Sequence, residues 1–139
     1  MREDLRCLNT ESRHGGLIPA RAWRTENADI RLATGLTGPV DAFNPAELLL
    51  ASIAACMIKG IERVLPLLDF SLDGVEVMLH AVRQDDLPRI VSIDYELLVD
   101  TEESEQRLEL LHKNVRKYGT ISNTIALAAR LDGVIRRAL

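Results

Sequence analysis

The sequence predicts an α+β fold, and the order of its patterned segments carries this prediction. Residues 75–81 and 91–99 alternate apolar and polar side chains, with the period of two expected for half-buried strands. Two segments with helical signals flank this pair, one beginning near residue 44 and one near residue 101. Because the strands are grouped rather than alternating strictly with helices, α+β is favoured over a parallel α/β sheet.

Short strands are expected in the first 43 residues. The candidate strands are residues 5–8, 20–25 and 28–34, with Glu26 and Asn27 as a hairpin turn. Glycines mark a turn at residues 12–16 and a loop before the first helix.

The first helix has a clear start and an unusual surface. Asn44 is a good N-cap, Pro45 suits the first helical position, and Glu47 completes a capping box. The sequence is apolar on every side through Ile58, which predicts burial inside a fold or a dimer. We expect a helix from residue 45 to about 64, ended or kinked by Pro66.

A hairpin follows over the two alternating runs, with residues 85–88 in the connection. The second helix is expected to be capped by Asp100 or Thr101 and to end at Gly119. Its apolar face comprises Leu108, Leu111, Val115 and Tyr118. The last residues fit either a further helix, from the spacing of their apolar side chains, or a strand.

Composition limits the possible functions. The net charge of −4 and the pI of about 5.4 argue against a nucleic-acid-binding surface. No apolar run approaches the ~20 residues that span a bilayer, and no signal peptide is evident, so a cytoplasmic location is expected. The length predicts a single domain over residues 1–139.

No cofactor or metal is expected. The three histidines, His14, His80 and His112, are widely separated and lack partners at ligand spacing. No nucleotide-binding glycine loop is present, and the two cysteines lie too far apart in sequence to indicate a disulfide scaffold.

The helix from Asn44 to Cys56 and the segment from Lys117 to Ile125 together resemble the osmotically induced protein C (OsmC) and organic hydroperoxide resistance (Ohr) family. Members of that family reduce hydroperoxides with a pair of cysteines. The resemblance implies two antiparallel sheets around two central helices in an intertwined homodimer. It also implies a short helix followed by a closing strand over about residues 130–137, which we favour over a helix.

Cys56 matches the reactive cysteine of the family. A thiol attacks peroxide as the thiolate, and Cys56 lies about 18 Å beyond the N-cap, too far for the helix dipole to act on it. It therefore needs a cation, and the resemblance implies Arg13 in the glycine-bearing turn at residues 12–16. Arg21 and Arg24 are the fallbacks. The alternative is that Cys56 is a buried small hydrophobe.

The match to the family's glutamate is displaced by one residue. That glutamate stands ten residues before the reactive cysteine, where this chain has Ala46, whereas Glu47 is nine before. At about 100° per residue, nine residues place Glu47 about 180° from Cys56 around the helix. Glu47 is therefore either only the acidic member of the capping box, or a catalytic partner through a shifted helix start.

Gly119 occupies the position of the family's second cysteine, although the following Ser-x-Thr of residues 122–124 is kept. Either Cys56 uses a small external thiol, or Cys7 substitutes, or the chain is not a peroxidase. We expect no intrachain disulfide under mild peroxide. The first hypothesis is an OsmC-like thiol protein, at most a one-cysteine peroxide reductase or redox sensor. The alternative is a non-enzymatic dimer that binds a small hydrophobic ligand.

Overall fold

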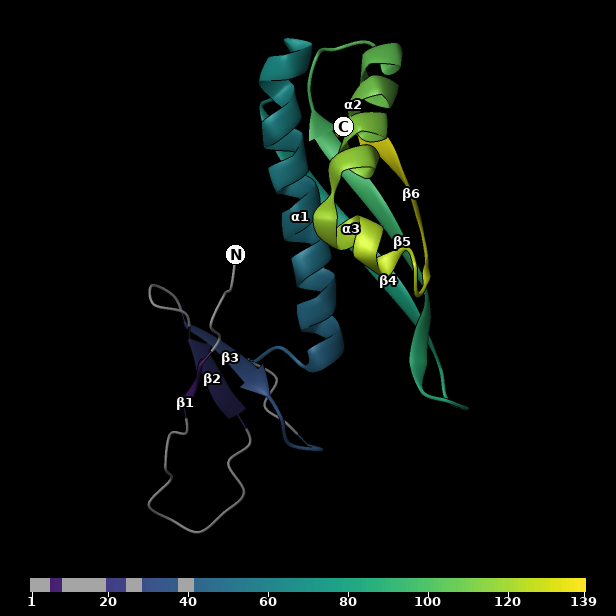
Figure 1. The fold of residues 1–139 in the computed structure, drawn as a ribbon. Coiled ribbons are helices and arrows are strands. Elements are labelled where there is room, and N and C mark those ends of the chain that lie inside the picture. The colour runs from purple at the N-terminus through teal and green to yellow at the C-terminus, as the bar shows by residue number, and fades with distance from the viewer. Residues whose placement is uncertain (1–5, 9–19, 25–28, 38–41) are drawn as a thin grey trace. The chain divides into compact units, whose positions relative to one another are not determined.

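The computed structural model describes residues 6–8, 20–24, 29–37 and 42–139. They belong to two compact units, Met1–Leu49 and Leu50–Leu139 (Figure 1). The single domain expected over residues 1–139 stays a prediction.

The first unit contains three short strands. β1 (Arg6–Leu8), β2 (Ala20–Arg24) and β3 (Asp29–Ala33) form an antiparallel sheet in the order β1-β2-β3. All three lie where the sequence predicts strands, and the pairing of β2 with β3 confirms the predicted hairpin. Its turn, at Glu26 and Asn27, lies outside the described residues.

Helix α1 (Pro45–Leu68) starts as predicted and runs beyond its predicted end. The expectation that the helix stops at about residue 64 is wrong, because Pro66 lies inside the final turn. A proline there removes only one of the helix's backbone hydrogen bonds. The helix then closes in a Schellman turn, in which Asp69 adopts φ 48° and the Phe70 N–H donates to the Leu65 carbonyl at 3.0 Å.

The end of α1 is also capped from another helix. Nη2 of Arg107 donates to the carbonyl oxygens of Leu68 and Asp69, both at 2.7 Å. Because carbonyl groups at a helix C-terminus carry partial negative charge, a guanidinium there is stabilising. Glu103 accepts from Nε of Arg107 at 2.5 Å and orients it.

One face of α1 is buried within the chain. The buried residues are Ile53, Met57, Gly60, Ile61 and Val64. Ala55, on another side of the helix, is exposed. The chain by itself therefore covers one stripe of the apolar segment, and burial of the remainder in a dimer stays a prediction.

The second sheet is mixed. β4 (Gly74–Gln84) and β5 (Arg89–Asp100) form the predicted antiparallel hairpin, and β6 (Arg130–Arg137) pairs with β5 in parallel. A closing strand is confirmed and the C-terminal helix alternative is wrong. The expectation of antiparallel pairing throughout is also wrong here, because the chain crosses back through two helices between β5 and β6.

Those two helices are α2 (Glu105–Tyr118) and α3 (Thr120–Ile125). The predicted caps of α2 are wrong, since Ser104 is the N-cap and Thr101 instead donates to the Ser71 carbonyl at 2.6 Å. Gly119 does end α2, but with φ −77° rather than a left-handed conformation, and the chain enters α3 at the next residue.

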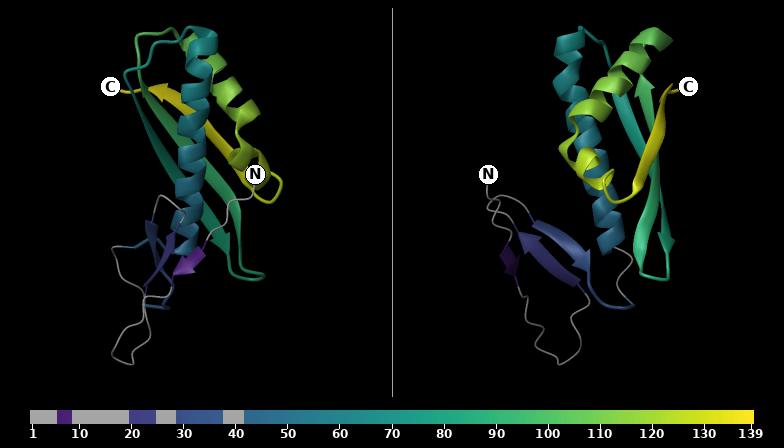
Figure 2. Two further views of the ribbon diagram at one scale, coloured as in Figure 1. Left: turned by 60° about the vertical axis from the view of Figure 1, so that its left-hand side comes forward. Right: turned by 45° about the vertical axis from the view of Figure 1, so that its right-hand side comes forward.

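α1 and α2 lie against the same face of this sheet (Figure 2). The predicted apolar face of α2 is confirmed at three of its four positions, because Tyr118 is half exposed. The core beneath the helices comprises Ile93, Tyr95, Leu97 and Val99 of β5 with Leu108, Leu111 and Val115 of α2. Within the described ranges, no helix is both long and apolar enough to cross a membrane.

Candidate functional site around Cys56

Cys56 lies in the middle of α1 and is half-buried, with a free thiol. It follows one turn after Ser52 and precedes Gly60 by one turn. This places Cys56 at the margin of the buried stripe of α1, where the residue is partly exposed in the single chain.

The packing of Gly60 shows which residues of α2 lie at the same height along the helix pair as Cys56. A Cβ atom added to Gly60 would lie 3.7 Å from Cγ1 of Val115, so these two positions face each other across the helix pair. The helices run in opposite directions (Figure 1). One turn back along α1 is Cys56, and one turn onward along α2 is Gly119. The structure therefore brings the sequence-predicted pair of positions, Cys56 and Gly119, to one level of the fold.

The surroundings of Gly119 are tight. A Cβ atom there would lie 3.1 Å from Oγ and 3.2 Å from Cβ of Ser122, and 3.3 Å from the Val115 carbonyl oxygen. Ser122 itself is 3% exposed, and its Oγ is one of two buried side-chain polar atoms without a hydrogen-bond partner in the described part of the chain. The Ser-x-Thr motif is visible in the sequence, but nothing in the sequence indicates that this hydroxyl is unpaired.

Glu47 is engaged at the start of α1. Its N–H donates to Oδ1 of Asn44 at 2.9 Å, and its Oε2 accepts from the Asn44 N–H at 2.9 Å. This reciprocal pair is a capping box, which confirms that interpretation of Glu47. The carboxylate is therefore committed to the helix start, nine residues before Cys56.

None of the arginine side chains predicted to stabilise the Cys56 thiolate is among those that the structure describes. Arg13 lies outside the described residues. The backbones of Arg21, Arg24 and Cys7 belong to β2 and β1, in the first unit. The approach of any of these side chains to Cys56 stays a prediction.

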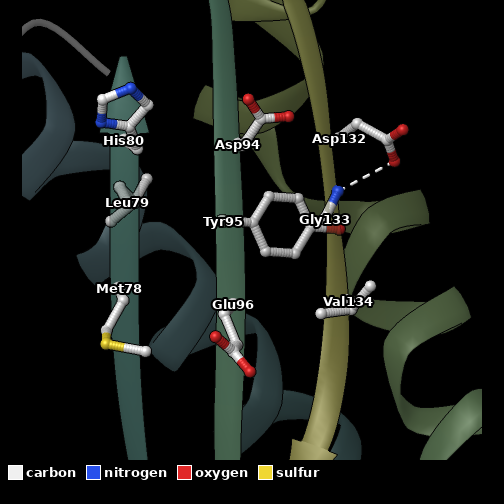
Figure 3. Close-up of a pocket in the computed structure, with 9 residues that line it drawn as sticks. All are labelled: Met78, Leu79, His80, Asp94, Tyr95, Glu96, Asp132, Gly133 and Val134. Atoms are coloured by element: carbon white, nitrogen blue, oxygen red, sulfur yellow. Dashed lines mark hydrogen bonds between the residues drawn. The ribbon is translucent and has the colours of Figure 1, made fainter.

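A hollow of about 530 Å³ lies on the second sheet (Figure 3), and Cys56 is not among its lining residues. Its floor is three cross-strand rows of β4, β5 and β6. These rows are Met78–Glu96–Val134, Leu79–Tyr95–Gly133 and His80–Asp94–Asp132.

The charges in this hollow are largely paired. Nη2 of Arg130 lies 2.9 Å from Oδ1 of Asp94, and Nε of Arg136 lies 3.1 Å from Oε1 of Glu96. The lining is thus a mixture of paired charges and a few apolar groups. Among the described residues, no group of three or more His, Cys, Asp or Glu side chains is arranged to hold a metal ion.

A polar cluster that was not predicted from the sequence lies between β5 and α2. The Tyr95 hydroxyl and Nε2 of His112 are 2.5 Å apart, and the Arg116 guanidinium stacks 5.5 Å from the Tyr95 ring centroid. Nη2 of Arg116 also donates to the Leu131 carbonyl at 2.9 Å. The alternation that places Tyr95 on the buried face of β5 could have indicated that its hydroxyl needs a partner.

Burial determines the ionisation of this cluster. Desolvation and the positive charge of Arg116 lower the pKa of His112, against a smaller raising effect of Asp132. Desolvation raises the pKa of Tyr95, although Arg116 acts in the opposite direction. When neutral His112 carries its proton on Nδ1, the Tyr95 hydroxyl donates to Nε2, and this hydrogen bond joins α2 to β5.

Comparisons with known proteins agree with this arrangement. An OsmC-like protein from Mycoplasma pneumoniae matches with a TM-score of 0.84 at 15% identity, covering 100% of this chain and 99% of that chain. The organic hydroperoxide resistance protein OhrB of Bacillus subtilis matches with a TM-score of 0.66 at 15% identity, covering 98% of each chain. The organic hydroperoxide resistance protein OsmC from Legionella pneumophila matches with a TM-score of 0.66 at 19% identity, covering 100% of this chain and 98% of that chain.

At these low sequence identities, the matches show that the fold is shared, but they do not show a shared activity. No curated protein matches the sequence. The family model described as OsmC-like protein matches residues 38–132, a range that includes Cys56 and the junction of α2 with α3. Because this model spans more than half of the sequence, the chain belongs to the OsmC-like protein family.

Proposed function

We propose that the protein is a one-cysteine hydroperoxide reductase or redox sensor in which Cys56 is the reacting group. The observation that carries the proposal is the position of Cys56, half-buried in α1 and level with Gly119. Two proteins of the same fold are named for organic hydroperoxide resistance, which supports hydroperoxides as the oxidant class.

The proposed reaction needs one hydroperoxide and two molecules of a small thiol. The Cys56 thiolate attacks the terminal peroxide oxygen, the O–O bond breaks, and the alkoxide takes a proton and leaves as the alcohol. Cys56 is oxidised to the sulfenic acid. One thiol then forms a mixed disulfide with release of water, and a second releases the external disulfide and restores the Cys56 thiol.

The external thiol is required because Gly119 offers none. In the two-cysteine route, the sulfenic acid condenses with a second cysteine of the same chain. The described structure has glycine at the level where that thiol would stand. Cys7 could supply the second thiol only if β1 approaches Cys56, and we propose instead that Cys7 serves only as a residue of that strand.

We assign Arg13 to hold the Cys56 thiolate, since a guanidinium stays charged and can donate several hydrogen bonds. The capping hydrogen bonds of Glu47 favour a structural role for that carboxylate over a catalytic one. We further propose a cytoplasmic homodimer, in which the apolar surface of α1 left open by the single chain is covered.

The test is peroxide-dependent consumption of a small thiol, with cumene hydroperoxide as oxidant. Wild-type protein should consume thiol, and Cys56→Ser should reduce the rate to that of the buffer, because no other described cysteine side chain is available. Cys7→Ser is the matched control and should retain the wild-type rate.

Equal rates in wild type and Cys56→Ser would refute the proposal. They would favour the alternative, a non-enzymatic dimer that binds a small hydrophobic ligand. A rate lost in Cys7→Ser would show that Cys7 takes the place of the missing second cysteine.

A further inference from the structure

We propose that the Ser122 hydroxyl holds the oxygen that Cys56 gains on oxidation, in the space left by the absent side chain of Gly119. This inference rests on the proposed function and gives the site a specific product, a stabilised sulfenic acid. Three observations on α1, α2 and α3 support it.

The first observation is the facing of the two helices. Gly60 meets Val115, which sets Cys56 level with the junction between α2 and α3. Figure 1 shows this junction alongside the middle of α1. We therefore infer that Gly119 and its neighbours lie opposite the Cys56 side chain.

The second observation is the direction of Ser122. Its Oγ lies 3.1 Å from the point where a Cβ atom of residue 119 would stand, so the hydroxyl borders the space on that side of the glycine. Any larger residue at 119 would push against Ser122 and fill this space. Glycine is thus the residue that leaves the buried hydroxyl its place beside position 119.

The third observation is the unused hydrogen-bonding capacity of this hydroxyl. Ser122 is 3% exposed, and its Oγ has no partner in the described part of the chain. Buried hydroxyl groups in native proteins are almost always hydrogen-bonded, so an unpaired one indicates a missing polar group. The oxygen of an oxidised cysteine supplies such a group.

The chemistry follows from this geometry. The Cys56 thiolate takes one oxygen from the hydroperoxide, which leaves as the alcohol, and the Ser122 O–H donates to the new sulfur-bound oxygen. No thiol at position 119 is present to displace that oxygen. It is retained until a small external thiol attacks the sulfur, forms the mixed disulfide and releases water.

The experiment follows the lifetime of the one-oxygen form. Wild type, Ser122→Ala and Thr124→Ala are treated with excess cumene hydroperoxide without reductant. Intact mass then reports protein carrying one oxygen or two, and dimedone labelling confirms the sulfenic acid. The Thr124 hydroxyl is a matched control, because it lies on the same short helix, is exposed and donates to the Thr120 carbonyl at 2.8 Å.

We expect the one-oxygen form of Ser122→Ala to pass to the two-oxygen form roughly tenfold faster than in wild type, the effect of one lost hydrogen bond. Thr124→Ala should match wild type. Ser122→Ala removes only an unpaired hydroxyl, so its melting temperature should not fall. Equal lifetimes in wild type and Ser122→Ala, or equal acceleration in both variants, would overturn the inference while leaving the proposed function intact. Wild-type Cys56 that gains no oxygen would overturn both.

Discussion

At the scale of single residues, Cys56 and His112 show two different environments for a side chain of a chemically reactive type. Both residues are half-buried, but Cys56 has a free thiol, whereas Nε2 of His112 lies 2.5 Å from the Tyr95 hydroxyl. A neutral histidine protonated on Nδ1 can accept this hydrogen bond and so link the two elements. We expect the stability of the fold to depend on pH for this reason alone, without any catalytic role for His112.

The direction of that dependence follows from the pKa of His112. Burial lowers this pKa below the ordinary value of 6.5, so the unfolded chain binds the proton more readily than the folded one. The contribution to stability is therefore complete above about pH 6.5 and is lost as the pH falls toward the lower, folded-state value. We expect the wild-type melting temperature to decline between pH 7.5 and 5.5.

The variant His112→Gln tests this assignment. Glutamine can still accept from the Tyr95 hydroxyl but does not titrate, so its melting temperature should depend less on pH across that range. His80→Gln, at an exposed position of β4, is the control and should keep the wild-type dependence. The measurement is thermal unfolding by circular dichroism at several pH values. A His112→Gln profile parallel to that of wild type would contradict the assignment.

At the scale of elements, the pairing of β6 with β5 depends on a close backbone approach. Gly133 stands opposite Tyr95 in the parallel register, and a Cβ atom there would lie 2.2 Å from the Tyr95 carbonyl oxygen and 2.5 Å from Cγ of its ring. Real Cβ atoms do not come this close to backbone, so β6 would have to shift. The same tyrosine ring is the one that meets His112.

Gly133→Ala should therefore destabilise the protein by roughly 1–3 kcal/mol or more, as expected for overpacking in a core. Gly74→Ala is the matched control on β4, where the added Cβ would meet only Cβ of Asp100 at 3.8 Å. Urea unfolding of both variants measures the difference in the free energy of unfolding. A Gly133→Ala variant as stable as Gly74→Ala would show that β6 is not held against Tyr95 in this register.

At the scale of the whole molecule, the open question is what covers the rest of α1. Its first half is apolar on every side up to Ile58, while the single chain buries one stripe and leaves Ala55 exposed. Charged residues return only at Lys59, Glu62 and Arg63. This pattern supports the proposed homodimer, with α1 near its centre.

Light scattering at micromolar concentration should give twice the chain mass of 15.5 kDa. Ala55→Glu should shift the mass toward that of one chain, because a carboxylate would be buried without a partner in the interface. Lys59→Glu changes charge one turn further on, at an exposed position, and should leave the dimer intact. A wild-type monomer would refute the proposed dimer, and an Ala55→Glu variant that stays dimeric would move the interface away from this face.

The sequence by itself determined the elements whose signals are local. The capping box of Asn44 and Glu47 set the start of α1, and the alternation of β4 and β5 set their pairing and their buried face. It also identified Cys56 and Gly119 as the positions of interest, through motifs that need no knowledge of contacts. These features are encoded within a few residues, which is why pattern alone could predict them.

Only the tertiary structure decided the features that join distant segments. The end of α1 past Pro66 depends on a cap from Arg107, and the direction of β6 depends on the crossover through α2 and α3. The unpaired hydroxyl of Ser122 and the partnership of Tyr95 with His112 are likewise products of packing. No local signal encodes them, because a hydrogen-bond partner or a clash exists only once two elements, far apart in sequence, have been placed against each other.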